Sequence, residues 1–207
     1  MIDAIYKRRS IRRFIQKPIS DEVLRPILEA GMWAPSEKNQ QPWKFVVIRG
    51  TERRAMVRCL KEGIAKNRKG DGIFAGYDKF IPSAIYTARI LEQAPVIVFV
   101  LNTEGFDPLE SRNPAELLKE FSDIESISAA VQNMCLAATD LGVGSLWTCN
   151  IFFAYHELKE WLGIPGEPVA ALALGYTDRE VRPMARKPFE DVVFYKGTDE
   201  NTIQSEE

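Results

Sequence analysis

Three short apolar runs constrain the fold of this chain more than any other feature. They are Trp43–Arg49, Pro95–Leu101 and Val169–Leu174, and each lies next to proline or glycine. Apolar runs of this length are typical of strands that are buried on both faces. Such strands need helices on each side, so the sequence predicts an α+β fold with one small sheet between helices. Residues 145–149 and 191–195 are weaker strand candidates.

The strongest helix prediction covers residues 123–141. Ser122 and Glu125 have the spacing of an S-x-x-E capping box. Gly142 follows at the position where a helix end favours a left-handed residue. The apolar residues recur at steps of three and four and form one stripe: Ile124, Ile127, Val131, Met134, Cys135, Ala138 and Leu141.

Caps and breakers predict four further helices. The first covers residues 21–33 after Ser20, and Pro26 inside it is expected to kink or shorten it. The others cover residues 51–62, the segment from Pro82 to just before Pro95, and residues 155–162.

Size and charge exclude several classes of protein. The chain has 207 residues, 27 basic and 29 acidic, which gives a net charge of −2. We expect a single domain over residues 1–198, and a disordered acidic tail over residues 199–207. The balanced charge argues against a surface built for nucleic acid or anionic membrane. No apolar stretch reaches the ~18 residues of a membrane span, and the N-terminus lacks the apolar core of a secretory signal.

The rarer residues exclude most metal and thiol chemistry. The single histidine, His156, makes a histidine-rich zinc site impossible, and we expect it at the surface or as a helix cap. The cysteines Cys59, Cys135 and Cys149 form no C-x-x-C pair, so zinc, thioredoxin and iron–sulfur sites lack their usual pattern. Sparse, odd cysteines fit a reducing compartment, and we expect a cytoplasmic protein.

A basic run near the N-terminus is the first candidate site. Residues 7–13 read KRRSIRR and hold five cations with one serine. The planar guanidinium groups of arginine can hydrogen-bond two phosphate oxygens at once, and a serine hydroxyl adds a further donor. The run is therefore a candidate phosphate-binding site. A solvated basic stretch or a nucleic-acid patch remains an alternative reading. A second pair of cations, Arg186 and Lys187, lies before the apolar run at 191–195.

Two other segments carry polar or glycine-rich patterns. Residues 34–43, APSEKNQQPW, place serine and amides between a helix and a strand, where they can read the edge of an imide-like ring. They also suit a plain polar connector. Residues 142–150, GVGSLWTCN, let the backbone approach a ligand closely but lack the dinucleotide fingerprint. Because no cationic partner is implied near Cys149, we interpret its thiol as inert.

Together these segments resemble the FMN-dependent members of the nitroreductase superfamily. The resemblance covers residues 2–195 with an unplaced stretch over 60–120, and R-R-S-x-R together with A-P-S-x-x-N-Q-Q-P-W is its most specific part. It implies a three-layer fold with a mostly antiparallel sheet and a homodimer that holds FMN at the subunit interface. A C-terminal strand exchanged between the subunits is also expected. Supporting motifs are ISAAVQNMCLAATDLGVGSLW, LGIPGEPVAALALGY and RPMARKPFEDVV.

The resemblance also implies roles for particular residues. Arg8 and Ser10 would face the ribityl phosphate, Arg12 would approach the pyrimidine edge, and Arg186 with Lys187 would form a second phosphate contact. The other matching positions are Arg9 in the first motif, the partner-facing loop residues Pro35, Ser36, Glu37, Asn39 and Gln41, and Trp147, Thr148 and Cys149 beside the ring.

The implied activity is electron transfer from NAD(P)H through FMN to a small acceptor. Nitroaromatics, quinones and flavins are the expected acceptors, and donor and acceptor would use one face of the ring in turn, in a ping-pong mechanism. The variable segment Lys66–Tyr86 is expected to cover the acceptor pocket with its aromatic residues. Reductive dehalogenation or a biosynthetic oxidation on the same fold is the alternative, and a non-enzymatic phospholigand or nucleic-acid module is a further one.

Overall fold

The computed structural model describes residues 2–107 and 110–197 of the chain. The predicted acidic tail over residues 199–207 lies outside the described residues. The helices are α1 (Asp3–Lys7), α2 (Asp21–Met32), α3 (Glu52–Lys69), α4 (Ile81–Gln93), α5 (Pro114–Asp140) and α6 (Tyr155–Leu162). The strands are β1 (Trp43–Arg49), β2 (Val96–Asn102), β3 (Gly144–Thr148) and β4 (Glu167–Gly175). Short 3-10 turns are η1 (Glu37–Asn39), η2 (Asp78–Phe80), η3 (Asn150–Ala154) and η4 (Phe189–Asp191).

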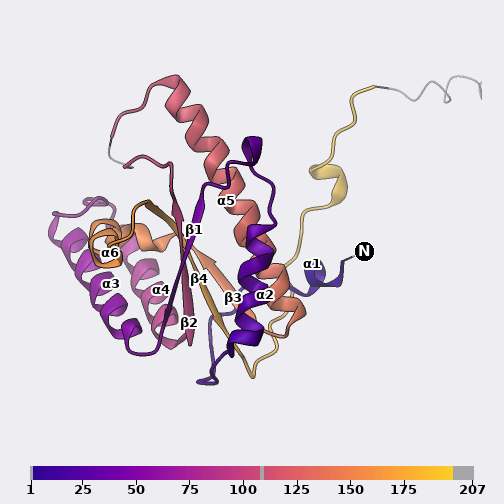
Figure 1. The fold of residues 1–207 in the computed structure, drawn as a ribbon, viewed down its shortest axis with the longest axis horizontal. Coiled ribbons are helices and arrows are strands. Elements are labelled where there is room, and N and C mark those ends of the chain that lie inside the picture. The colour runs from indigo at the N-terminus through magenta and orange to yellow at the C-terminus, as the bar shows by residue number, and fades with distance from the viewer. Residues whose placement is uncertain (1, 108–109, 198–207) are drawn as a thin grey trace, which may run out of the picture.

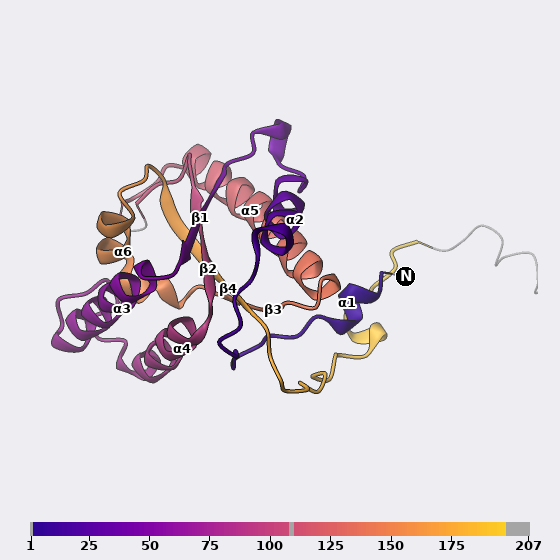
Figure 2. The same cartoon turned by 60° about the horizontal axis from the view of Figure 1, so that its bottom comes forward.

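The four strands form one antiparallel sheet in the order β1-β2-β4-β3. Helices α2 and α5 cover one face, and α3, α4 and α6 cover the other (Figures 1 and 2). Every residue of β2 is buried. Its side chains alternate, so Ile97 and Phe99 join the core under α3 and α4, while Val96 and Val98 join the core under α2 and α5. The predicted α+β fold with a sheet between helices is confirmed.

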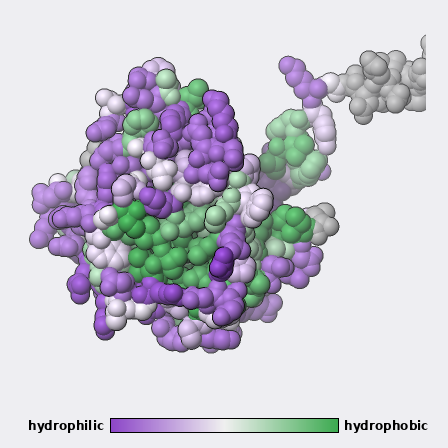
Figure 3. Space-filling model, in the orientation of Figure 1, coloured by the Kyte–Doolittle hydropathy of each residue, from purple (hydrophilic) through white to green (hydrophobic). Residues whose placement is uncertain are grey.

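The two edges of the sheet differ. At the β3 edge, Ser10 forms a parallel bridge with Ser145, and the Ile11 N–H donates to the Ser145 carbonyl at 2.8 Å. At the other edge, β1 pairs only with β2 within the described chain. Figure 3 shows hydrophobic residues gathered over the sheet on this face, surrounded by polar ones. The β1 edge therefore keeps free backbone donors and acceptors beside an apolar surface.

The start of α5 differs from the prediction. The helix begins at Pro114, and its capping box is made by Asn113 and Glu116. The Asn113 side chain accepts from the Glu116 N–H at 3.0 Å, and the Glu116 carboxylate accepts from the Asn113 N–H at 2.9 Å. Ser122, the predicted cap, lies inside the helix. The sequence N-P-A-E has the same box spacing and the added signal of proline at the first helical position.

Other element boundaries also differ from the prediction. Pro26 does not end α2, because a proline in the second turn removes only one hydrogen bond and its carbonyl partner on Glu22 is on an exposed residue. Helix α3 continues seven residues beyond the predicted end to a left-handed Gly70 with φ of 91°. The weak strand predicted at residues 191–195 is not a strand in this single chain, where η4 and exposed residues occupy the segment. No described helix is both long and apolar enough to span a membrane.

Candidate functional site

The N-terminal basic segment is fixed along β3. Ile11 and Phe14 are buried, at 7% and 8% exposure, so the cations between and beside them face outward. Ile11 packs directly on Gly144, where an added Cβ would lie 2.7 Å from its Cγ1. Glycine at this position therefore lets the segment lie against the strand.

Three of the four arginines of this segment, Arg8, Arg9 and Arg12, are used differently. Arg9 donates to the carbonyls of Tyr6 at 2.6 Å and Arg8 at 2.9 Å, so its guanidinium holds its own turn. Arg12 donates to the Ser10 carbonyl at 3.3 Å. The half-buried Arg8 guanidinium has no hydrogen bond or ion pair with any residue that the structure describes. Arg8 is therefore a half-buried cation of this segment that is free for a ligand.

Arg8 lies beside two small groups of the α5–β3 layer. Burial raises the pKa of the Cys135 thiol, and the neighbouring Ser145 hydroxyl and the Arg8 charge partly offset that rise. The Ser145 Oγ is itself buried without a hydrogen-bond partner among the described residues. The positive charge of Arg8 therefore reaches the buried Cys135 thiol, and its guanidinium, which has no partner among the described residues, could pair with an anionic oxygen.

The second basic segment stands apart from the body of the protein. Arg186 and Lys187 are exposed. Among the described residues the Arg186 guanidinium donates only to carbonyls of its own turn, Met184 at 3.1 Å and Ala185 at 3.4 Å. Both ribbon views show the chain after β4 running past α1 (Figures 1 and 2). After β4 the cation that reaches the first segment is Arg179, which the prediction did not assign. It lines a cavity of about 330 Å³ together with Lys7 and the predicted Arg9.

The polar loop between α2 and β1 is a strained, closed turn. Lys38, Asn39 and Gln41 have φ of 48°, 58° and 52°, which is the left-handed region. Each such non-glycine residue costs about 1–2 kcal/mol. The Ser36 hydroxyl closes the turn by accepting from the Gln41 N–H at 3.0 Å. Strained backbone of this kind persists where the surrounding structure holds it and is frequent at ligand sites.

Helix α5 holds this loop through two serines that the sequence did not single out for this role. The Ser122 hydroxyl donates to the Glu37 carboxylate at 2.8 Å. The Ser126 hydroxyl donates to the Ser122 carbonyl at 2.7 Å and accepts weakly from the Glu37 N–H at 3.4 Å. Hydrogen bonds from Lys38 and Ser122 lower the pKa of Glu37, so its carboxylate stays ionised. A separation of more than 80 residues hid these contacts from sequence patterns.

The end of β3 contributes a third element. Trp147 is 38% exposed and Thr148 is half-buried, and the Thr148 hydroxyl accepts from the Asn150 N–H at 3.2 Å. Cys149 is exposed as a residue, yet partial burial of its thiol raises the pKa. Asn150, which the prediction did not assign, donates to Thr87 Oγ1 at 2.8 Å and ties this turn to α4.

The predicted cover segment is divided between core and surface. Phe74 stacks on Phe153 with ring centroids 4.8 Å apart, and the buried Asn67 side chain accepts from the Phe74 N–H at 2.7 Å. The exposed members are Tyr77, Phe80 and Tyr86. His156 is exposed on α6, as expected. Across residues 2–107 and 110–197, no group of three His, Cys, Asp or Glu side chains could hold a metal ion.

The loop and the first basic segment lie at opposite ends of α2 (Figure 1). The helix has 12 residues and is therefore about 18 Å long. The fold brings Arg8, Ser10 and Trp147–Cys149 to one edge of the sheet, β3. It leaves the loop residues Pro35–Gln41 at a separate position in the same chain.

The chain is similar to known proteins in sequence and in fold. The model of the Nitroreductase family matches residues 5–176. A protein of Archaeoglobus fulgidus, assigned as an NADH dehydrogenase/NAD(P)H nitroreductase, is 33% identical over 85% of this chain and 84% of its own length. A crystal structure from Desulfovibrio desulfuricans, described as a nitroreductase in complex with FMN, is 31% identical with a TM-score of 0.68 and covers 95% of this chain and 96% of its own. An FMN-dependent nitroreductase from Mycobacterium smegmatis, in complex with NADPH, shares the fold at 19% identity and a TM-score of 0.72, over 94% of this chain and 96% of its own.

Proposed function

The chain belongs to the nitroreductase family, and from that premise we propose that it is an FMN-dependent oxidoreductase that takes electrons from NAD(P)H. The observation that carries this proposal is the half-buried Arg8 guanidinium, which has no hydrogen bond or ion pair with any described residue. A phosphate group would satisfy it, since phosphate offers several charged oxygens to one planar fork. The names of the similar proteins support the same cofactor and electron donor.

The chain's residues would divide the binding of FMN between them. Arg8 and Ser10 would hold the phosphate, Arg12 would face the pyrimidine edge, and the backbone of Trp147–Cys149 would run beside the ring. FMN supplies the redox chemistry when bound, so the protein needs to bind, orient and tune it. This division fits a chain in which Cys149 has a raised pKa and the single histidine lies on the surface.

We propose that two copies of the chain complete the site. The loop residues Ser36–Gln41 and the Arg8 segment lie at opposite ends of α2, so a partner's loop is needed beside each Arg8. The β1 edge is open, and the exposed segment after Pro188 carries the apolar residues that an added strand needs: Phe189, Val192, Val193, Phe194 and Tyr195. These features support a homodimer with FMN at its interface and a C-terminal strand exchanged onto β1.

The acceptor would be a small aromatic molecule such as a nitroaromatic, a quinone or a flavin. Tyr77, Phe80 and Tyr86 expose rings that can stack on such a molecule. Donor and acceptor would use the same face of the ring in turn, which is ping-pong kinetics. Free cysteines at positions 59, 135 and 149 support a cytoplasmic location. Within this proposal the described residues act as one FMN-binding domain.

Flavin content and flavin reduction test the proposal. The purified protein is expected to be yellow, with one FMN per chain, and to bleach on mixing with NADH or NADPH under anaerobic conditions. Parallel lines in initial-rate plots against acceptor concentration are expected for the ping-pong scheme. A protein that stays colourless after incubation with excess FMN would overturn the proposed function.

A further inference from the structure

A cavity that the proposed flavin site does not use lies between α3 and α4. Its volume is about 360 Å³, which lies within the size range of small-molecule sites. The floor is apolar and is formed by Ile64 of α3 with Ile85 and Ala88 of α4. The remaining lining consists of Ala65 and four charged residues, of which three are cations: Lys61, Arg68, Arg89 and Glu92.

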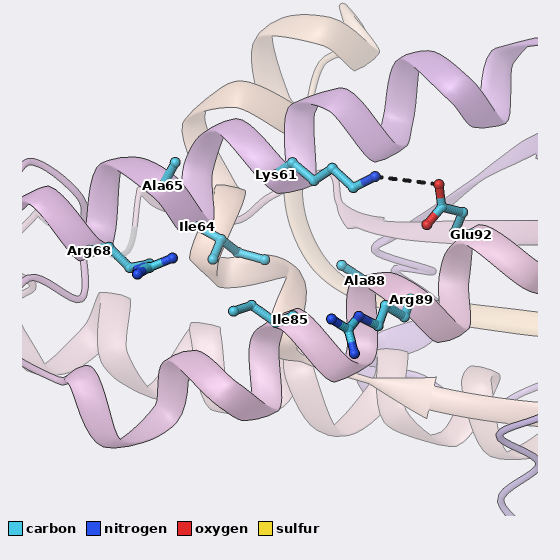
Figure 4. Close-up of a pocket in the computed structure, with 8 residues that line it drawn as sticks. All are labelled: Lys61, Ile64, Ala65, Arg68, Ile85, Ala88, Arg89 and Glu92. Carbon is cyan, nitrogen blue, oxygen red and sulfur yellow. Dashed lines mark hydrogen bonds and ion pairs between the residues drawn. The ribbon is translucent and has the colours of Figure 1, made fainter.

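Two arginines line this floor from different helices. Arg68 comes from α3 and Arg89 from α4, and the side chains of Ile64 and Ile85 lie between their guanidinium groups (Figure 4). Neither has a hydrogen bond or ion pair with another described residue. Both side chains are cationic, so each would attract an anion bound over the apolar floor. One end of the cavity is closed by Lys61, which pairs with Glu92 at 3.4 Å.

The surrounding field also favours an anion. Helix α3 carries seven basic and two acidic residues, in a chain whose net charge is −2. A second cavity of about 260 Å³ adjoins the first through Lys61 and Glu92 and is lined by Arg54 and Arg58. Clefts lined by charge of one sign concentrate ligands of the opposite sign.

We propose that the α3–α4 groove binds a phosphomonoester of an apolar or aromatic alcohol. Two planar forks from different helices call for a group with at least three outward oxygens, which phosphate has and carboxylate lacks. The apolar floor under Ile64 and Ile85 calls for a body that excludes water, so free phosphate alone is a poor match. The groove residues are none of those assigned to FMN, so a failure of FMN binding would leave this inference standing.

The test is a calorimetric titration of the protein, held in excess FMN, with 1-naphthyl phosphate. Saturable binding at one ligand per chain is expected, with inorganic phosphate at least tenfold weaker. Arg68→Ala and Arg89→Ala should each weaken the naphthyl phosphate at least tenfold, and Arg68→Lys should restore part of the loss. Lys69→Ala is the matched control, since it removes the same charge from the next position of α3 outside the cavity.

The same titration can overturn the proposal. Absence of saturable binding would show that the groove is not a specific site. Equal weakening by Lys69→Ala and Arg68→Ala would show that only the general positive charge of α3 attracts the ligand. If inorganic phosphate bound as tightly as 1-naphthyl phosphate, the apolar floor would contribute nothing to binding. Arg68 and Arg89 are exposed, so their variants should fold, and circular dichroism checks this. Adenosine 2′-monophosphate and adenosine 5′-monophosphate, used as competitors, identify the natural molecule that carries the phosphate. Tighter binding of the 2′ isomer assigns the groove to the 2′-phosphate of NADPH. Tighter binding of the 5′ isomer assigns it to a separate phosphomonoester.

Discussion

The two basic segments proposed to hold the phosphate of FMN are built in different ways. The first is attached to the sheet through the Ser10–Ser145 bridge and through the buried Ile11 and Phe14. The second, around Arg186, is exposed along its whole length and contacts its own backbone. The fold of one chain therefore prepares the first contact, while the second must be ordered by a ligand or by another copy of the chain. That ordering costs conformational entropy, which the first segment has already lost on folding.

The largest effect should come from removing the apolar C-terminal segment. This truncation tests whether the exposed second basic segment depends on a partner subunit. A chain ending at Lys187 keeps both cations but loses the segment from Pro188 onward. Burial of its five apolar side chains on a partner should contribute several kcal/mol, so the dimer dissociation constant should rise by roughly a hundredfold or more. Sedimentation velocity measures the dimer, and flavin content measures the site. Deletion of residues 198–207 alone is the control and should change neither.

A smaller effect is expected from removing the prepared cation. Arg8→Ala should weaken FMN by about 1.5–3 kcal/mol, because it removes a charge-assisted contact from a half-buried position. Arg8→Lys should rescue only part of this loss, since lysine lacks the planar fork. Fluorescence titration of the apoprotein with FMN gives the affinities. Arg13→Ala removes an exposed charge nearby and should leave affinity almost unchanged.

Arg186→Ala sharpens the comparison. Its effect should be smaller than that of Arg8→Ala, because binding through Arg186 is offset by the ordering of an exposed segment. Equal losses of FMN affinity for the two variants would show that the second segment is already ordered in the dimer. The two segments would then differ only in the isolated chain.

The serines under the strained loop should have a smaller effect again. Ser122→Ala and Ser126→Ala each remove hydrogen bonds that hold Glu37 and the backbone of the loop. A loss of about 0.5–1.5 kcal/mol in FMN affinity is expected for each. Ser128→Ala, on the same helix and without a described side-chain bond, is the matched control. If the three variants behave alike, α5 does not position the loop.

Cys149 should show the smallest effect. Because burial raises the pKa of its thiol, less thiolate is present at neutral pH, and alkylation by iodoacetamide should be slower than for free cysteine. Cys149→Ser should keep most of the turnover, since the backbone at this position is what the proposed site uses. Loss of turnover with FMN still bound would require a step that depends on the thiol.

Regular elements were predictable where local signals agreed. Uninterrupted apolar runs located β1, β2 and β4, and Gly142 and Gly163 ended α5 and α6 in left-handed conformations. The start of α5 was missed because two boxes of the same spacing, at Asn113 and Ser122, compete and proline favours the first. The strand predicted at 191–195 has the right composition, but composition cannot say which chain supplies its neighbour.

The candidate site was predictable in its residue types and less so in its contacts. The R-R-S-x-R segment carried the signal for Arg8, yet only the fold distinguishes the free Arg8 from Arg9, whose guanidinium is used on the backbone. The roles of Ser122, Ser126 and Asn150 depend on neighbours more than 60 residues away. No pattern along the chain encodes such pairs.

The strained loop also sets a limit on how this protein can be improved by selection. Lys38, Asn39 and Gln41 hold positive φ without being glycine, so glycine at these positions should raise thermal stability by relieving about 1 kcal/mol each. A library screened for heat resistance alone would therefore accumulate glycine there. Asn39 and Gln41 would then lose the amide groups through which the loop is proposed to bind the flavin. The selected variants would have higher thermal stability and lower affinity for FMN.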